Sequence, residues 1–247
     1  MNPQNGHPRL SVVIPAYNER LLLPAALEAV EGALAAAGWR EVSEVVVCDN
    51  ASTDETAELA AQRGARVVRE PRRNIAAVRN TGARAACGEW LIFTDADSQV
   101  SPGLLAETLL ALEDPHVVAG GSLVAVQSDH PRARRAVALW NWLSTRKSLA
   151  AGGYIFCRKA DFDAIGGFDD SFYAGEELDF TRRMKALGRR TGRRFVILTR
   201  HPLLTSARKL DYPLRWSDLF KGLLFALGCD RVAKNPRNCG MWYDVDR

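Results

Sequence analysis

The chain has 247 residues, of which 47% are hydrophobic and 25% are charged, a balance typical of an ordinary globular protein. This length fits one large domain that can bury a core, and we predict a single domain over residues 1–247. The formal net charge of +4 is mild. It allows attraction to anionic substrates or to membrane surfaces, and it gives no reason to expect a nucleic-acid partner.

The cysteines and the amino-terminal segment bear on location. Five cysteines form an odd number without a Cys-x-x-Cys pair, and Cys48 and Cys157 lie in apolar runs. This favours reduced thiols in a cytosolic protein over disulfides or a zinc site. The opening segment MNPQNGHPRL lacks the apolar stretch of a signal peptide. No apolar run reaches the roughly 18 residues needed to span a bilayer. We expect a cytoplasmic protein, either soluble or peripheral at the inner membrane face.

Strand and helix signals alternate through the first half of the chain. Apolar, β-branched runs predict buried strands over residues 10–16, 42–48, 65–69 and 90–94. Helical signals predict helices over residues 19–37, from a capping box of Ser52 and Glu55 to Gly64, over residues 74–87, and from Ser101-Pro102 onward. Such alternation is typical of a Rossmann-like, mostly parallel sheet with helices on both faces.

The second half is less regular. We predict strands over residues 117–126, 152–158 and near 194–198. We predict helices over residues 132–147, over residues 174–187 with Gly188 closing the helix, and over residues 213–228. The first of these helices is basic and carries Trp140 and Trp142, which fits either a solvated face or an anionic or lipid-linked acceptor near a membrane. The last is amphipathic, which fits either packing on the core or peripheral membrane contact.

Polar side chains follow three of the predicted parallel strands. They are Tyr17, Asn18 and Glu19 after the first strand, Asp49, Asn50 and Ser52 after the second, and Asp95 and Asp97 after the fourth. In open α/β sheets, ligands bind beyond the carboxyl ends of the strands. The fold therefore brings these side chains to one edge, where we expect the site.

Asp95-Ala96-Asp97 directly follows a buried strand. Two carboxylates at this spacing can hold a hard divalent cation, Mg²⁺ or Mn²⁺, together with substrate phosphates. The alternative is a solvated turn in which Asp97 caps the next helix. Asp49 can accept a hydrogen bond from a nucleobase or ribose, and the capping box of Ser52 and Glu55 leaves it without a capping role.

Two further segments carry charged groups with two interpretations each. Arg79 lies in a helix before Asp95, where its guanidinium can contact a diphosphate or brace Asp95, or can simply be exposed. Glu176 and Glu177 begin a helix, where acids favour the helix dipole. Two adjacent carboxylates near a metal site can also raise the pKa of one of them and make it a general base.

Four motifs in this order resemble the family 2 glycosyltransferases with a GT-A fold. They read SVVIPAYNE, VVVCDNASTDET, AVRNTGARAACGEWLIFTDADS and GGFDDSFYAGEELDFTRRMKALG, and the resemblance covers about residues 10–210. It implies a nucleotide-sugar-binding half over about residues 10–115 and an acceptor-binding half over about residues 116–210. Residues 211–247 are then a carboxy-terminal helix and tail.

The resemblance also implies roles for individual residues. Its nucleotide-sugar-binding set is Pro15, Tyr17, Glu19, Asp49, Arg79, Asp95, Ala96, Asp97 and Arg208, and its acceptor-binding set is Gly152, Gly153 and Tyr154. Asp97 is the direct metal ligand, with Asp95 beside it. Glu177 stands where the family has the aspartate of a Glu-Asp pair, which leaves both Glu177 and Glu176 as candidate bases. His201 lies too early for the histidine ligand of many relatives, and Ser206 or Arg208 occupies that place.

The implied activity is the metal-dependent, inverting transfer of a sugar from a nucleotide sugar, most commonly a UDP-sugar, to an acceptor hydroxyl. A nucleotidyltransferase is an alternative, but it needs a glycine-rich basic loop where this chain has AYNER. A non-catalytic sugar-nucleotide-binding protein is the other alternative, which the acidic side chains Asp95, Asp97 and Glu177 disfavour. The residues do not identify the acceptor, which on this basis is either soluble or lipid-linked.

Overall fold

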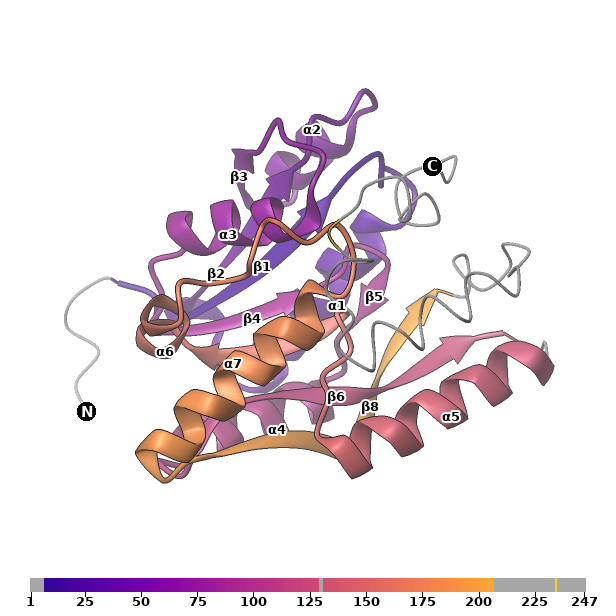
Figure 1. Ribbon diagram of the computed structural model, residues 1–247. Helices are drawn as coiled ribbons and strands as arrows, with labels where there is room; N and C mark the ends of the chain where they lie inside the picture. Colours follow the sequence, from indigo (N-terminus) through magenta and orange to yellow (C-terminus); the bar gives the residue numbers. More distant parts are fainter. Residues whose placement is uncertain (1–6, 129–130, 207–233, 235–247) are drawn as a thin grey trace.

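The computed structural model describes residues 7–128, 131–206 and Lys234, which form a layered α/β structure (Figure 1). A sheet with the strand order β3-β2-β1-β4-β7-β6-β8-β5 lies at its centre. The strands are β1 (Leu10–Ala16), β2 (Ser43–Asp49), β3 (Arg66–Arg69), β4 (Trp90–Thr94), β5 (Ser98–Gln99), β6 (Val117–Gln127), β7 (Tyr154–Arg158) and β8 (Arg194–Ser206). The helices are α1 (Leu23–Ala36), the 3₁₀ helix η1 (Arg40–Val42), α2 (Thr56–Gln62), α3 (Ile75–Ala85), α4 (Pro102–Glu113), α5 (Pro131–Lys147), α6 (Lys159–Ala164) and α7 (Glu176–Thr191).

The four strands of the amino-terminal half run parallel to one another. β1 pairs with both β2 and β4, and β2 pairs with β3. β7 pairs antiparallel with both β4 and β6, while β6 and β8 are parallel. The predicted mostly parallel α/β sheet is confirmed, and its antiparallel pairs all involve β7 or the short β5.

Helices cover both faces of the sheet, as predicted. On one face, α1 and α4 pack against alternate strand residues such as Val12 and Ile14. On the other face, α3, α6 and α7 pack against the intervening residues, such as Val13. The alternation arises because successive side chains of a strand point to opposite faces. Since both faces are covered, the strands are continuous apolar runs rather than alternating patterns.

Most predicted elements are confirmed with small shifts at their ends. β1 and β4 have the predicted bounds, and Ser101 caps α4 by accepting a hydrogen bond from the Leu104 backbone N–H. The prediction that Gly188 closes α7 is wrong, because the helix continues to Gly192, whose φ is 67°. A Cβ at Gly188 would lie 2.5 Å from the Arg193 carbonyl oxygen, so this glycine permits a close approach inside the structure.

The predicted capping box before α2 is wrong. α2 begins at Thr56, and Glu55 at its N-cap position makes no side-chain hydrogen bond to the helix. The Ser52 hydroxyl instead accepts a hydrogen bond from the Asn18 backbone N–H at 3.0 Å. The Ser52 N–H in turn donates to the Asp49 carboxylate at 3.3 Å. Ser52 therefore ties the loop after β1 to the loop after β2.

Three short elements, η1, β5 and α6, were not predicted. The predicted helix over residues 213–228 lies outside the described residues. Among the helices that the structure describes, none is both long and apolar enough to cross a membrane. Of the cysteines in the described ranges, Cys48, Cys87 and Cys157 are free thiols.

Candidate active site

An open pocket with a volume of about 230 Å³ lies where β1, β2 and β4 end. Eleven of the predicted site residues line it: Pro15, Tyr17, Glu19, Arg79, Asp95, Ala96, Asp97, Gly152, Gly153, Glu176 and Glu177. Six further residues also line it: Ala16, Asn50, Arg73, Ile75, Val78 and Gly175. Segments far apart in the chain therefore meet at the edge of the sheet that the fold class predicts.

The direction of β7 explains why Gly152 and Gly153 lie in this pocket. In the antiparallel pair of β4 and β7, Tyr154 lies opposite Thr94. The start of β7 is therefore beside the end of β4, and the Asp95 backbone N–H donates to the Gly153 carbonyl oxygen at 3.4 Å. A parallel β7 would have carried these glycines to the opposite edge of the sheet.

The guanidinium of Arg79 joins the two groups of carboxylates. It is 3% exposed and forms an ion pair with Glu176, which is 4% exposed. It also donates to Asp95 Oδ1 at 3.2 Å and to the Gly152 carbonyl oxygen at 2.7 Å. Burial disfavours the charged guanidinium, but the negative charges of Glu176, Asp95 and Glu177 offset this and raise the Arg79 pKa. The interpretation that Arg79 braces Asp95 therefore agrees with the geometry, and the exposed alternative does not.

Glu176 and Glu177 occupy the first turn of α7, directly after Gly175 in a left-handed conformation with φ 73°. Glu176 is held by Arg79, whereas Glu177 is half-buried on the pocket wall. A Cβ built on Gly152 would lie 3.6 Å from the Glu177 carboxyl carbon. Burial first, and then the charge of Glu176, raise the pKa of Glu177 above its ordinary value of 4.5, while the charge of Arg79 opposes this. A raised carboxyl pKa suits a group that exchanges protons near neutral pH.

Replacing Arg79 with methionine is expected to lower the free energy of unfolding by about 3–5 kcal/mol, because Glu176 would keep a buried charge without its partner. For a chain of this size, we expect the melting temperature to fall by roughly 6–20 °C. Circular dichroism melts measure this, with Arg84→Met as the control because Arg84 is exposed on the same helix. Equal melting temperatures for the two variants would contradict a buried Arg79 brace.

The pocket contains donors that fit a divalent cation. Asp95 and Asp97 both line it, and Asp97 Oδ2 accepts a hydrogen bond from the Ser206 hydroxyl at 2.8 Å. Hard cations in phosphate-binding sites use one or two carboxylates and complete their shell with substrate oxygens and water. The described residues include no group of three His, Cys, Asp or Glu side chains that could hold a metal. Two carboxylates therefore fit a cation that shares its coordination with a bound diphosphate.

Two further residues complete the pocket near the ends of β1 and β2: Asn50, which the sequence placed at this edge without a specific role, and Arg73, which it did not indicate. The Arg73 guanidinium carbon lies 3.6 Å from the centroid of the Tyr17 ring. The Asn50 side-chain amide donates to the backbone carbonyls of Glu70 and Arg72, each at 2.7 Å. These bonds fix the loop that carries Arg73. The only sequence signal for Arg73 is its place a few residues after the third parallel strand, at the same sheet edge.

Asp49, by contrast, is not among the residues that line the pocket. Its side chain is buried, accepts a hydrogen bond from the Ser52 N–H, and lies 4.0 Å from the Arg69 Nε. The sequence argument that left Asp49 without a capping role depended on a capping box that does not form. The assignment of Asp49 to the base or ribose stays a prediction.

Tyr154 is also outside the pocket, which corrects its predicted place beside Gly152 and Gly153. Its side chain is completely buried, and its hydroxyl is 2.9 Å from the Thr108 hydroxyl on α4. Strand alternation accounts for this, because the side chain of the first residue of β7 points into the core under α4. Tyr154 therefore belongs to the core.

Replacing Tyr154 with phenylalanine is expected to lower the free energy of unfolding by about 1 kcal/mol through loss of the hydrogen bond to Thr108. Because no ligand contact is lost, kcat and KM should stay at the wild-type values. Denaturant unfolding and steady-state kinetics measure the two quantities. A rise in the KM for the acceptor at wild-type stability would restore Tyr154 to the site.

The last two sequence candidates lie elsewhere. Arg208 lies outside the described residues. His201 Nδ1 is 3.2 Å from Glu107 Oε1 on α4, and His201 is not among the pocket residues. The expectation that His201 lies too early to be a metal ligand stays a prediction.

Similarity to known proteins was found at the level of sequence. Residues 11–166 match the family described as Glycosyl transferase family 2. An uncharacterized glycosyltransferase of Mycobacterium tuberculosis is 35% identical over 54% of this chain and 52% of its own length. A dolichol-phosphate mannosyltransferase of Pyrococcus furiosus is 27% identical over 62% of this chain and 41% of its own length. The chain thus spans about half the length of the curated relatives that it matches.

Solved structures share the fold. A mannosyltransferase from Pyrobaculum calidifontis, in complex with GDP-Man and Mn²⁺, superposes with a TM-score of 0.65 and 23% identity over 92% of this chain and 63% of that chain. Glucosyl-3-phosphoglycerate synthase from Mycobacterium tuberculosis, in complex with Mn²⁺, UDP and glucosyl-3-phosphoglycerate, gives a TM-score of 0.59 and 20% identity over 91% of this chain and 80% of that chain. These similarities confirm the GT-A type of fold. Since the family match covers more than half of the chain, the protein belongs to glycosyl transferase family 2.

Proposed function

We propose that this protein transfers a sugar from a nucleoside-diphosphate sugar to an acceptor hydroxyl with inversion at the anomeric carbon, with UDP-sugars as the donor class. The observation that carries the proposal is the meeting of Asp95, Asp97 and the Glu176–Glu177 pair in one pocket of a family 2 chain. Solved relatives of the same fold hold GDP-Man with Mn²⁺ or UDP with Mn²⁺. The nucleotides bound in these structures support a nucleotide-sugar donor here.

Donor binding is assigned to the edge where β1, β2 and β4 end. Tyr17 and Arg73 offer stacked aromatic and guanidinium faces to the nucleobase, and Asn50 lines the same pocket. A divalent cation held with Asp95 and Asp97 would offset the charge of the diphosphate and so favour its departure. Arg79 keeps both Asp95 and Glu176 in place through its buried hydrogen bonds.

Proton transfer is assigned to Glu177. Its carboxylate accepts the proton of the acceptor hydroxyl, and that oxygen forms the new bond to the anomeric carbon. The bond from the anomeric carbon to the diphosphate oxygen breaks on the opposite side, so the configuration inverts and the nucleoside diphosphate leaves. Glu176 is the weaker candidate for the base because its carboxylate is buried against Arg79. Gly152 keeps the space next to Glu177 open, since a side chain there would contact this carboxyl group.

The test is a screen of UDP-, GDP- and dTDP-sugars with Mn²⁺ or Mg²⁺, read by thermal shift and by release of the nucleoside diphosphate. Metal-dependent stabilisation together with slow donor hydrolysis is the expected result, because water replaces a missing acceptor. Formation of pyrophosphate from a nucleoside triphosphate and a sugar phosphate would assign a nucleotidyltransferase instead. If donor and metal raised the melting temperature but no nucleoside diphosphate was released, either alone or with any acceptor tried, the protein would be a non-catalytic binding protein.

A further inference from the structure

Helix α5 carries cationic and large apolar side chains on one exposed face. Leu139 is 66% exposed and Trp142 is 54% exposed. Arg135 and Arg146 are exposed on the same stripe, because residues four, seven and eleven positions after residue 135 share one helix face. The Arg146 guanidinium lies over the Trp142 ring, 5.0 Å from its centroid. The helix contains no aspartate or glutamate, so nothing on it neutralises these charges.

The opposite face of α5 is the one that packs on the protein. Asn141 exchanges hydrogen bonds with the Val124 backbone of β6, and Ser144 is completely buried. Trp140 packs against Phe172 and its neighbours in the segment that leads into α7. Figure 1 shows α5 at the periphery of the molecule, alongside β6. The stripe of Arg135, Leu139, Trp142 and Arg146, here called the α5 stripe, therefore faces away from the body of the protein.

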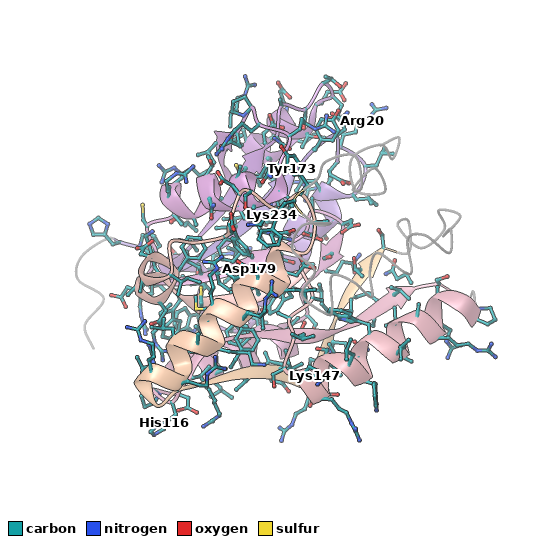
Figure 2. The ribbon with its side chains drawn as sticks, in the orientation of Figure 1. Arg20, His116, Lys147, Tyr173, Asp179 and Lys234 are labelled. Atoms are coloured by element: carbon teal, nitrogen blue, oxygen red, sulfur yellow. The ribbon has the colours of Figure 1, made fainter. Side chains whose placement is uncertain are left out.

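Further basic groups adjoin the carboxy-terminal end of α5. Lys147 lies at the end of α5 nearest α7 (Figure 2). The Lys185 ammonium of α7 donates to the Lys147 carbonyl oxygen at 2.7 Å. Burial first, and then the charges of the nearby Arg189 and Lys147, lower the Lys185 pKa, so Arg189 is another basic group near this junction. The cationic surface is therefore wider than α5 alone.

We propose that the α5 stripe is a docking surface for an anionic membrane. Basic side chains meet lipid phosphates, while Leu139 and Trp142 enter the boundary between headgroups and acyl chains, where tryptophan is favoured. The two exposed apolar side chains between the arginines favour a membrane over a nucleic acid, since a phosphate backbone uses cations and leaves a leucine in water. The mild net charge of the whole chain agrees with a local cationic surface rather than with a nucleic-acid-binding protein.

This docking surface would set the class of acceptor, and that part of the inference rests on the proposed function. The inner face of α5 contacts the segment that carries Glu176 and Glu177, and Gly152 of the pocket follows the end of α5 by five residues. A bilayer on the outer face therefore lies about one helix diameter, roughly 10 Å, from the segment that bears the general base. The acceptor class that fits this distance is a lipid-linked molecule whose hydroxyl is anchored at the surface of that bilayer.

The experiment is flotation of the full-length protein with vesicles of phosphatidylcholine alone and of phosphatidylcholine mixed with phosphatidylglycerol. We expect binding to the anionic vesicles only, with release in about 1 M salt, where the Debye length is about 3 Å. Leu139→Glu combined with Trp142→Glu should weaken binding at least about tenfold. Arg135→Gln combined with Arg146→Gln should weaken it about 25-fold, since each basic residue near the surface contributes about fivefold.

Leu110→Glu is the matched control, because Leu110 is 68% exposed but lies on α4, between Glu107 and Glu113. It should bind vesicles like the wild type, and all variants should keep the wild-type melting temperature and donor hydrolysis. Undiminished vesicle binding by both α5 double variants would overturn the proposal and place the contact elsewhere in the chain. Absence of wild-type binding, or equal competition by a short duplex DNA, would overturn it too. Vesicle binding without any donor hydrolysis would instead contradict the proposed function and leave the docking surface intact.

Discussion

Replacing Asp97 with alanine should reduce donor turnover by roughly 10³-fold or more, the largest loss that we expect from one substitution. Asp97 lines the pocket as the second carboxylate of Asp95-Ala96-Asp97, and the family resemblance implies that it is the direct metal ligand, which this substitution tests. A cation that offsets the charge of a leaving diphosphate contributes several kcal/mol, and each 1.36 kcal/mol is a factor of ten in rate. The stabilisation of the protein by UDP in the presence of Mn²⁺ should disappear in the same variant.

A second variant separates metal binding from folding at this position. Asp97 Oδ2 also accepts a hydrogen bond from Ser206, and its backbone carbonyl accepts one from the Ser206 N–H at 3.2 Å. Asp97→Asn keeps an oxygen acceptor for the Ser206 hydroxyl and removes the charge, so it should melt like the wild type and still fail to turn over donor. If the wild-type protein kept its full activity in the presence of EDTA, the metal requirement on which both predictions rest would be refuted.

Glu177→Gln is the second large effect: transfer should fall by about 10²- to 10⁴-fold while the affinity for UDP with Mn²⁺ stays unchanged. The range is the usual cost of losing a general base. Glu176→Gln keeps an acceptor for Arg79 but removes the buried charge of the pair, so it should lower the melting temperature more than Glu177→Gln does. If Glu176→Gln loses transfer at unchanged stability and Glu177→Gln does not, the base is Glu176.

The raised pKa of Glu177 adds a pH signature. The folded protein holds this proton more tightly than the unfolded chain does, so the protonated Glu177 stabilises the fold at low pH. This contribution to the free energy of unfolding is lost as the pH rises from 4.5 through the raised pKa of the folded state. Transfer by the wild type should increase over the same interval, since the base acts when deprotonated. The melting temperature of Glu177→Gln should exceed that of the wild type at alkaline pH by a few degrees, about 2–4 °C for each kcal/mol. If the melting temperatures of the wild type and of Glu177→Gln changed with pH in the same way, this would contradict a titrating Glu177.

Local chemistry in the sequence determined the layered α/β fold and most of the candidate site. β1 and β4 are apolar runs buried on both faces, and this burial makes their bounds readable from hydrophobicity alone. Polar residues that directly follow parallel strands must reach one edge, which correctly brought Tyr17, Asp95 and Asp97 together. The order of four motifs added Glu176 and Glu177, which no periodicity connects to that edge.

Tertiary structure decided the features that depend on direction, pairing and burial. No residue pattern states that β7 runs antiparallel, yet that direction brings Gly152 and Gly153 to the pocket and sends the Tyr154 side chain into the core. Nor does an arginine in a helix show which carboxylates it will meet. The Arg79 ion pair joins residues 97 positions apart, and only the packed fold brings them together.

The same distinction applies to the two members of the glutamate pair and to Ser52. Sequence chemistry placed both glutamates in the first turn of a helix, but the packed fold decided that Arg79 pairs with Glu176 and that burial raises the pKa of Glu177. Ser52 has the residue type of a helix cap, and the neighbouring loop after β1 offered its hydroxyl a donor at Asn18 instead. Residue type sets what a side chain is able to bind, whereas long-range packing selects its partner, because partners distant in sequence become neighbours only when the core forms.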